Sequence, residues 1–214
     1  MFVEFSNFAP MFKNRTTFTK RLLSVLTSVF LASTFSITAH AQAKMDTVFA
    51  NMPDSIIPYL TKNNRLDCID FIRNNMKAEV ENLFETKSEL TDLTDNYLRM
   101  KLNSITTLEL KLFTVDGKDS IICMSKTILM PEPDSEVSFF NLEWQPMEIP
   151  FDLKQSAPAT ATTEPTLNEA VLSKDGETIT IKRHRIFSKD KELNSTTTTS
   201  RVYKWNGKTL EQEL

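Results

Sequence analysis

Two aspartates, Asp67 and Asp70, are the first side chains whose spacing could support chemistry. Residues three apart lie on one face of a helix, so these carboxylates could act as the acid and base of a hydrolase. Acidic side chains on a helix are more often solvated surface groups. A carboxylate-based hydrolase acting on a glycan or peptide is therefore the alternative function, and we assign no residue as catalytic.

The sequence lacks the residue combinations that other catalytic and cofactor-binding sites require. After residue 41 the chain keeps one histidine, His184, on a strand face that we expect to be exposed. Structural zinc requires four ligands, and Cys68 and Cys123 are the only cysteines, so we expect no metal. They could form a disulfide or remain two buried thiols. The three glycines fall in separate predicted turns, which leaves no phosphate-binding loop and no expected cofactor.

The candidate ligand residues are aromatic or lie at a helix edge. Trp144 and Trp205 could stack on a ligand, although tryptophans more often fill a core. Arg73 lies beside the apolar stripe of the predicted helix, where it could pair with Asp70 or cover the core with its aliphatic stem. These four residues are the predicted ligand-site candidates.

The first 41 residues have the pattern of a signal peptide. Basic residues precede an uncharged apolar run from Leu22 to Ile37, and Ala39-His40-Ala41 fits a signal-peptidase site. We therefore expect cleavage before Gln42, export to the periplasm or beyond the cell, and no stable membrane insertion after cleavage. The segment holds four basic residues and one acidic residue, so its removal makes the chain more acidic than its net charge of −3. An acidic chain is a poor partner for nucleic acid.

The stretch from Met52 to Phe84 is predicted to be the helical part of the domain. Apolar residues recur there at spacings of three and four, which predicts one buried stripe: Leu66, Ile69, Ile72, Met76, Val80 and Leu83. Asp54 or Ser55 is expected to cap a first short helix, and Asn64 a second one.

From Lys87 onward the pattern changes to strands. Leu108, Leu110 and Leu112 alternate with Glu109 and Lys111, as in an antiparallel sheet with one covered and one wet face. Asp-Gly and Asn-Gly pairs predict three hairpin turns, at Asp116-Gly117, Asp175-Gly176 and Asn206-Gly207.

The predicted fold is α+β, with two N-terminal helices on one face of a curved, mostly antiparallel sheet of about seven to nine strands. Residues 42–214 are expected to form a single domain. Four prolines among alanines and threonines predict a mobile connection at about 145–168. The strands after it are too few to form a core alone, so we expect them to join the same sheet.

Three stretches of the predicted helical region resemble a family of exported Bacteroidales proteins, a domain of unknown function. They are Asn51-Met52-Pro53-Asp54-Ser55, Leu60-Thr61-Lys62-Asn63-Asn64-Arg65-Leu66-Asp67 and Met76-Lys77-Ala78-Glu79-Val80. The family implies a signal peptide, a short helical start and a strand-rich body, and no active site. In that bacterial group, Asp-Ser/Thr-apolar triplets of exported proteins can carry O-linked glycans. The resemblance therefore implies Thr47, Ser55 and Ser120 as possible acceptors, while helix capping and turn chemistry also explain the two serines.

The sequence favours a non-catalytic binding or interaction module of the bacterial cell envelope. Its expected partner is an envelope protein, a glycan or a small apolar ligand. A binding module should expose an apolar groove or patch, whereas a hydrolase should bring carboxylates together in a deep cleft.

Overall fold

A computed structural model describes residues 43–117, 119–130, 132–158, 166–185 and 199–213. The predicted signal peptide lies outside these residues. The described helices are α2 (Met45–Ala50), α3 (Lys62–Arg73) and the single turn α4 (Leu153–Ser156). Within the described part of the chain, no helix is both long and apolar enough to cross a membrane.

The strands form two antiparallel sheets instead of the single predicted sheet. The seven-stranded sheet runs in chain order: β1 (Ala78–Glu81), β2 (Lys87–Leu93), β3 (Tyr97–Lys101), β4 (Thr106–Val115), β5 (Asp119–Ile128), β6 (Asp134–Phe140) and β7 (Pro146–Met147). The four-stranded sheet consists of β8 (Thr166–Leu172), β9 (Thr178–Arg185), β10 (Thr199–Trp205) and β11 (Leu210–Gln212). The prediction that the last strands join the first sheet is therefore wrong.

The helical region is shorter than predicted because α3 ends at an asparagine pair. Asn75 has a positive φ of 56°, and Met76 N–H donates to the Phe71 carbonyl at 2.9 Å. Asn75 N–H also donates to the Ile72 carbonyl, which completes a Schellman motif. The apolar residues after this stop lie outside the helix, and Leu66 within α3 is exposed, so the predicted buried stripe is correct only for Ile69 and the half-buried Ile72.

The predicted helix caps are also wrong. Residues 51–60 form turns, and the first described helix is α2, which precedes them. The cap of α3 is Thr61, whose side chain accepts from Asn64 N–H, while the Asn64 side chain accepts from Thr61 N–H. Asn64 thus completes a capping box from inside the helix.

The three predicted hairpin turns are confirmed. They join β4 to β5, β8 to β9, and β10 to β11. In the first, Asp116 and Gly117 have positive φ values of 47° and 73°, and the register pairs Val115 with Asp119 across the turn.

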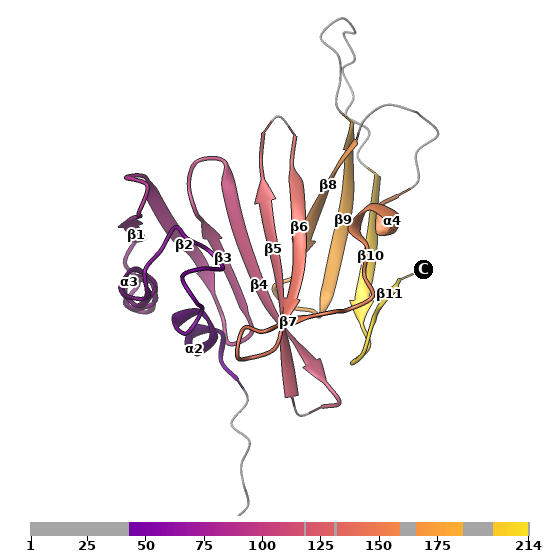
Figure 1. The fold of residues 1–214 in the computed structure, drawn as a ribbon, viewed down its shortest axis with the longest axis horizontal. Coiled ribbons are helices and arrows are strands. Elements are labelled where there is room, and N and C mark those ends of the chain that lie inside the picture. Colours follow the sequence, from indigo (N-terminus) through magenta and orange to yellow (C-terminus); the bar gives the residue numbers. More distant parts are fainter. Residues whose placement is uncertain (1–42, 118, 131, 159–165, 186–198, 214) are drawn as a thin grey trace, which may run out of the picture. The chain divides into compact units, whose positions relative to one another are not determined.

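Two apolar cores lie on opposite faces of the seven-stranded sheet. On one face, α3 packs against β1 and β2 and α2 packs against β4, and Figure 1 shows both helices beside the first strands. The other face packs against the four-stranded sheet through side chains such as Phe113 and Trp205, whose rings stack at 5.5 Å. Cys68 lies in the first core and Cys123 in the second, and both are free thiols. Burial raises the pKa of Cys68 to about 11 and also raises that of Cys123.

The second sheet covers part of the face that was predicted to be wet. Glu109 and Lys111 alternate with leucines as expected, but both are buried, because the four-stranded sheet packs over β4–β6. Arg99 and Lys101, on the neighbouring β3, remain exposed. The predicted pattern is thus correct for the first strands and wrong for the central ones.

Among the described strands, one edge of β8 has no neighbouring strand, and side chains of the seven-stranded sheet form hydrogen bonds to its backbone there. Three of its backbone N–H groups are bound in this way: Asn168 by Asp134 Oδ1 (3.1 Å), Ala170 by Ser135 Oγ (2.9 Å) and Leu172 by Glu109 Oε2 (3.1 Å). Ser125 Oγ donates in turn to the Ala170 carbonyl at 2.7 Å. An open strand edge is a site of unwanted pairing, and these side chains occupy it.

The predicted mobile connection contains some regular structure. β7 and α4 fall within it, and Asp152 caps α4 by accepting from the N–H groups of Lys154 and Gln155. Residues 159–165 of the connection lie outside the described residues, and its mobility stays a prediction.

Candidate functional site

The structure places both candidate tryptophans in the cores. The Trp144 indole N–H donates to the Val48 carbonyl at 3.1 Å, which attaches α2 to the end of β6. The Trp205 indole N–H donates to the Thr114 carbonyl at 2.7 Å. Each ring therefore joins two elements of the fold, and neither indole lines one of the surface hollows described below.

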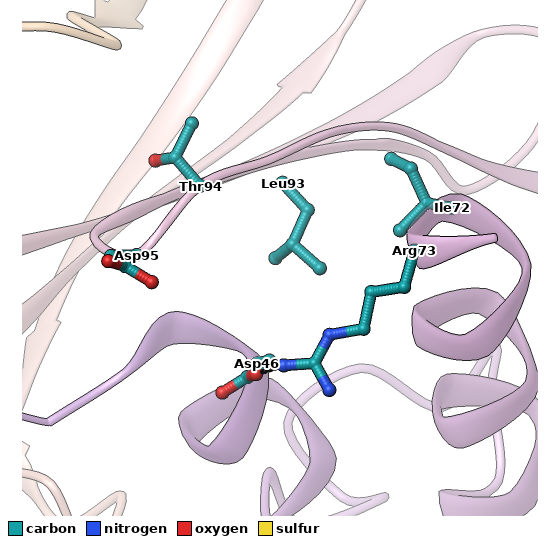
Figure 2. Close-up of a pocket in the computed structure, with 6 residues that line it drawn as sticks. All are labelled: Asp46, Ile72, Arg73, Leu93, Thr94 and Asp95. Carbon is teal, nitrogen blue, oxygen red and sulfur yellow. Dashed lines mark ion pairs between the residues drawn. The ribbon is translucent and has the colours of Figure 1, made fainter. Parts of the chain in front are cut away.

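Arg73 lies in a groove between α2 and α3. Its guanidinium forms an ion pair with Asp46 on α2, and Asp70 points to solvent without joining this pair. Figure 2 shows the Arg73 side chain extending from α3 toward Asp46, with Leu93 beside it. Arg73 thus finds its partner on another helix and not on its own.

The ion pair of Asp46 with Arg73 lies between two small hollows, which both residues line. The first has a volume of about 190 Å³ and is bordered by Ile72, Leu93 and the turn after β2. The second has about 290 Å³ and is bordered by residues of α2 and α3. Drug-sized ligands usually occupy pockets of about 300–1,000 Å³. These hollows are too small for such a ligand, and we do not assign one.

The buried carboxylate of Glu109 is a structural acceptor. Its oxygens accept from the Tyr97 hydroxyl at 2.7 Å and from Leu172 N–H at 3.1 Å, so both are occupied. Burial, together with this hydrogen bond, raises the pKa of Tyr97. The nearby ammonium of Lys111 donates to the Lys174 carbonyl at 2.8 Å, and burial lowers the pKa of Lys111. This polar cluster fixes the two sheets together.

His184 is less exposed than predicted. Its side chain keeps 12% of its exposure, and Nε2 lies 3.0 Å from Glu169 Oε2 on the neighbouring β8. Glu132 Oε2 lies 3.9 Å from Nδ1. Two carboxylates therefore border the imidazole where the second sheet meets the turn after β5.

A larger apolar surface lies at the turns of the seven-stranded sheet. Of the nine large apolar side chains that are exposed in the described part of the chain, six lie in or beside the β1–β2, β3–β4 and β5–β6 turns. We call these six the hairpin-tip surface: Leu83, Phe84, Ile105, Ile128, Leu129 and Met130. The antiparallel order of consecutive strands places the three turns at one end of the sheet, at the top of Figure 1.

Contacts join these turns into one surface. The Phe84 ring packs edge-to-face on Tyr59 at 5.1 Å, and the Tyr59 hydroxyl accepts from Asn103 in the β3–β4 turn at 3.4 Å. Leu129 N–H donates to the Ile105 carbonyl at 2.8 Å, which connects the β5–β6 turn to the β3–β4 turn. These contacts connect the three turns to one another.

Asn82 organises the turn that presents Leu83 and Phe84. Its buried side-chain amide donates to Ser88 Oγ and to the Leu102 carbonyl, both at 2.9 Å. Its side-chain oxygen accepts from Phe84 N–H at 2.9 Å. A turn held from inside presents its apolar side chains in one arrangement, which lowers the entropic cost of binding.

The sequence pattern does not predict this surface. Leu83 falls in the predicted helix stripe, because its spacing from Val80 and Met76 continues the helical pattern. A usable signal was present: apolar pairs stand beside turn-forming residues at Asn82-Leu83-Phe84 and Leu129-Met130-Pro131. Apolar residues in a turn have no strand neighbour to cover them.

The three proposed O-glycan acceptors differ in accessibility. Thr47 and Ser55 are exposed, and Ser120 is half-buried on β5. The Thr47 hydroxyl contacts Asp46 Oδ1 at 3.1 Å. Glycosylation of these residues stays a prediction.

The first two of the three motifs behind the family resemblance meet at one buried arginine. Arg65, from the second motif, donates to Asp54 Oδ1 at 2.8 Å and to the Met52 carbonyl, both in the first. It also donates to the Leu60 carbonyl at 2.7 Å, and only 1% of the residue is exposed. Arg65 thus fixes the connection between α2 and α3, which gives both motifs a structural role.

Comparison with known proteins identifies the family. The model described as "Protein of unknown function (DUF3256)" matches residues 36–201. The chain belongs to this family. In this chain the matched region contains the described helices, the seven-stranded sheet, β8, β9 and the start of β10. No protein with a curated functional description matches the sequence.

One similar solved structure is titled "Structure of a domain of an uncharacterized protein from Porphyromonas gingivalis W83". It has a TM-score of 0.62 and 19% sequence identity, and the match covers 81% of this chain and 100% of that one. At this identity the likeness shows the fold alone.

Proposed function

We propose that this DUF3256 protein is an exported, non-catalytic interaction module of the bacterial cell envelope, and that it binds its partner through the hairpin-tip surface. The sequence pattern of residues 1–41 supports export, and the resemblance of the helical motifs supports an origin among Bacteroidales. The observation that carries the proposal is the set of six exposed apolar side chains on three connected turns at one end of the sheet. Soluble proteins seldom expose contiguous apolar area without a binding role.

The contacts that hold Phe84 in place support the same proposal. Phe84 is 57% exposed although its backbone N–H is fixed by Asn82 and its ring rests on Tyr59. Aromatic side chains held in one conformation are frequent anchors of interfaces, because little conformational freedom is lost on binding. Phe84 is therefore the proposed centre of the interface.

The test uses an uncharged probe, so that apolar contact alone is measured. A helical peptide with a leucine face and glutamine elsewhere is titrated into the mature protein and followed by fluorescence anisotropy. Phe84→Ser should weaken binding at least about tenfold, as expected of an interface anchor. Leu66→Ser is the matched control, because Leu66 is exposed on α3, away from the three turns. Equal affinities of the two variants would refute the proposed surface.

A further inference from the structure

The charges around the hairpin-tip surface indicate which kind of partner it fits. The three turns contain two acidic residues, Glu85 and Glu132, and no lysine or arginine. Glu85 directly follows Phe84, and Glu81 stands at the end of β1 beside the same turn. Within the described part of the chain, neither Glu81 nor Glu85 has an ion-pair partner within 4.0 Å.

The lysines at the adjoining strand ends are already paired. Lys101 Nζ lies 3.5 Å from Glu89 Oε2, and Lys126 Nζ lies 2.8 Å from Glu136 Oε2. Lys87 and Lys77 share one carboxylate, with Nζ atoms 2.6 Å and 2.5 Å from the two oxygens of Glu79. Paired cations contribute little net field, whereas unpaired carboxylates keep theirs. At the β1–β2 turn the three acids Glu79, Glu81 and Glu85 outnumber the two lysines, so the border there is negative.

We propose that the partner is a protein segment whose apolar side chains are bordered by lysine or arginine. This inference rests on the proposed function. Opposite charges at the rim of an interface speed association and favour one partner over others. The same border opposes two other occupants. Anionic lipid headgroups would be repelled, and so would a second copy of the chain, because a two-fold contact brings identical acidic rims together.

The experiment compares three peptides that share one leucine face and differ only in their flanking residues, which are lysine, glutamine or glutamate. Affinities for the mature protein are measured by fluorescence anisotropy at low and high salt. We expect the lysine peptide to bind about tenfold more tightly than the glutamate peptide, with the glutamine peptide between them. The difference should shrink in high salt, where exposed charges are screened.

Variants show whether the preference comes from this border. Glu85→Lys should remove most of the preference for lysine flanks and leave the affinity for the glutamine peptide nearly unchanged. Glu143→Lys is the matched control, since Glu143 is an exposed acid in the turn after β6, at the other end of the sheet. It should leave the preference intact. Circular dichroism checks that each variant is folded.

The outcomes separate this inference from the proposed function. If the glutamine peptide depends on Phe84 but lysine flanks give no advantage, the surface binds and the charge inference is overturned. If no peptide depends on Phe84, both are overturned. Phe84-dependent binding to phosphatidylglycerol vesicles would assign the surface to a membrane and overturn the inference. A dimer in sedimentation velocity that Phe84→Ser dissociates would overturn it in favour of a second copy.

Discussion

Replacing Glu109 by leucine should weaken the attachment of the second sheet to the first and lower the stability of the fold. The substitution leaves the Tyr97 hydroxyl and Leu172 N–H without the acceptor that they share, and all three groups are buried. Each unsatisfied buried group costs about 1–3 kcal/mol. The added apolar contact of leucine offsets part of this loss. We expect Glu109→Leu to lower the free energy of unfolding by about 2–5 kcal/mol. Glu109→Gln keeps one acceptor oxygen and should cost about half as much.

The assay is urea denaturation followed by tryptophan fluorescence, with the midpoint and slope fitted for each variant. Glu89→Leu is the matched control, because Glu89 lies on the same sheet face beyond the cover of the second sheet and pairs with exposed Lys101. An exposed pair of this kind contributes about 0–1 kcal/mol. Equal losses for Glu109→Leu and Glu89→Leu would refute the role of the buried carboxylate in fixing β8.

Three further predictions concern the cores. Ile69→Ala should lower the free energy of unfolding, measured by urea denaturation, by about 2–5 kcal/mol, because Ile69 lies on the buried side of α3. Leu66→Ala, on the exposed side of α3, should lower it by less than about 1 kcal/mol. Equal losses would mean that α3 is not packed as described. Cys68 and Cys123 should not react with a thiol reagent at pH 8 in the folded protein, since burial raises the pKa of both thiols. Both should react in denaturant. Rapid labelling of the folded protein would contradict their burial. Burial lowers the pKa of Lys111 below its usual value of 10.5, so the unfolded chain binds more protons than the folded chain as pH approaches 10.5. In that pH range this group makes the free energy of unfolding rise with pH. Lys111→Met should remove this rise relative to wild type, and an unchanged pH profile would contradict the prediction.

Local patterns predicted the hairpins correctly, because Asp116-Gly117 requires only its own backbone geometry. The end of α3 was missed because Met76 and Leu83 continue the helical spacing beyond Asn75, whose left-handed conformation stops the helix. The Asn74-Asn75 pair was the available signal, since asparagine tolerates this conformation at helix ends.

The second sheet could not be predicted from alternation. Glu109 and Lys111 have the spacing of a solvated strand face, and the partners that make their burial possible lie 63 residues later in the chain. A polar residue on a strand is buried when such partners exist, and the sequence does not show which distant backbone group will reach it. The candidate tryptophans were misplaced for a related reason, because Trp144 bonds to α2 and Trp205 to β4 over comparable separations.

The most direct test of the central claim, that the hairpin-tip surface holds a partner, is photo-crosslinking in the bacterium that produces the protein. Phe84→p-benzoylphenylalanine places the crosslinker at the proposed centre, and Leu66→p-benzoylphenylalanine places it on the exposed side of α3. We expect a discrete adduct to another envelope protein from position 84, lost when Ile105→Ser and Met130→Ser are added, and no such adduct from position 66. The absence of an adduct at position 84, or the same adduct from both positions, would contradict the claim.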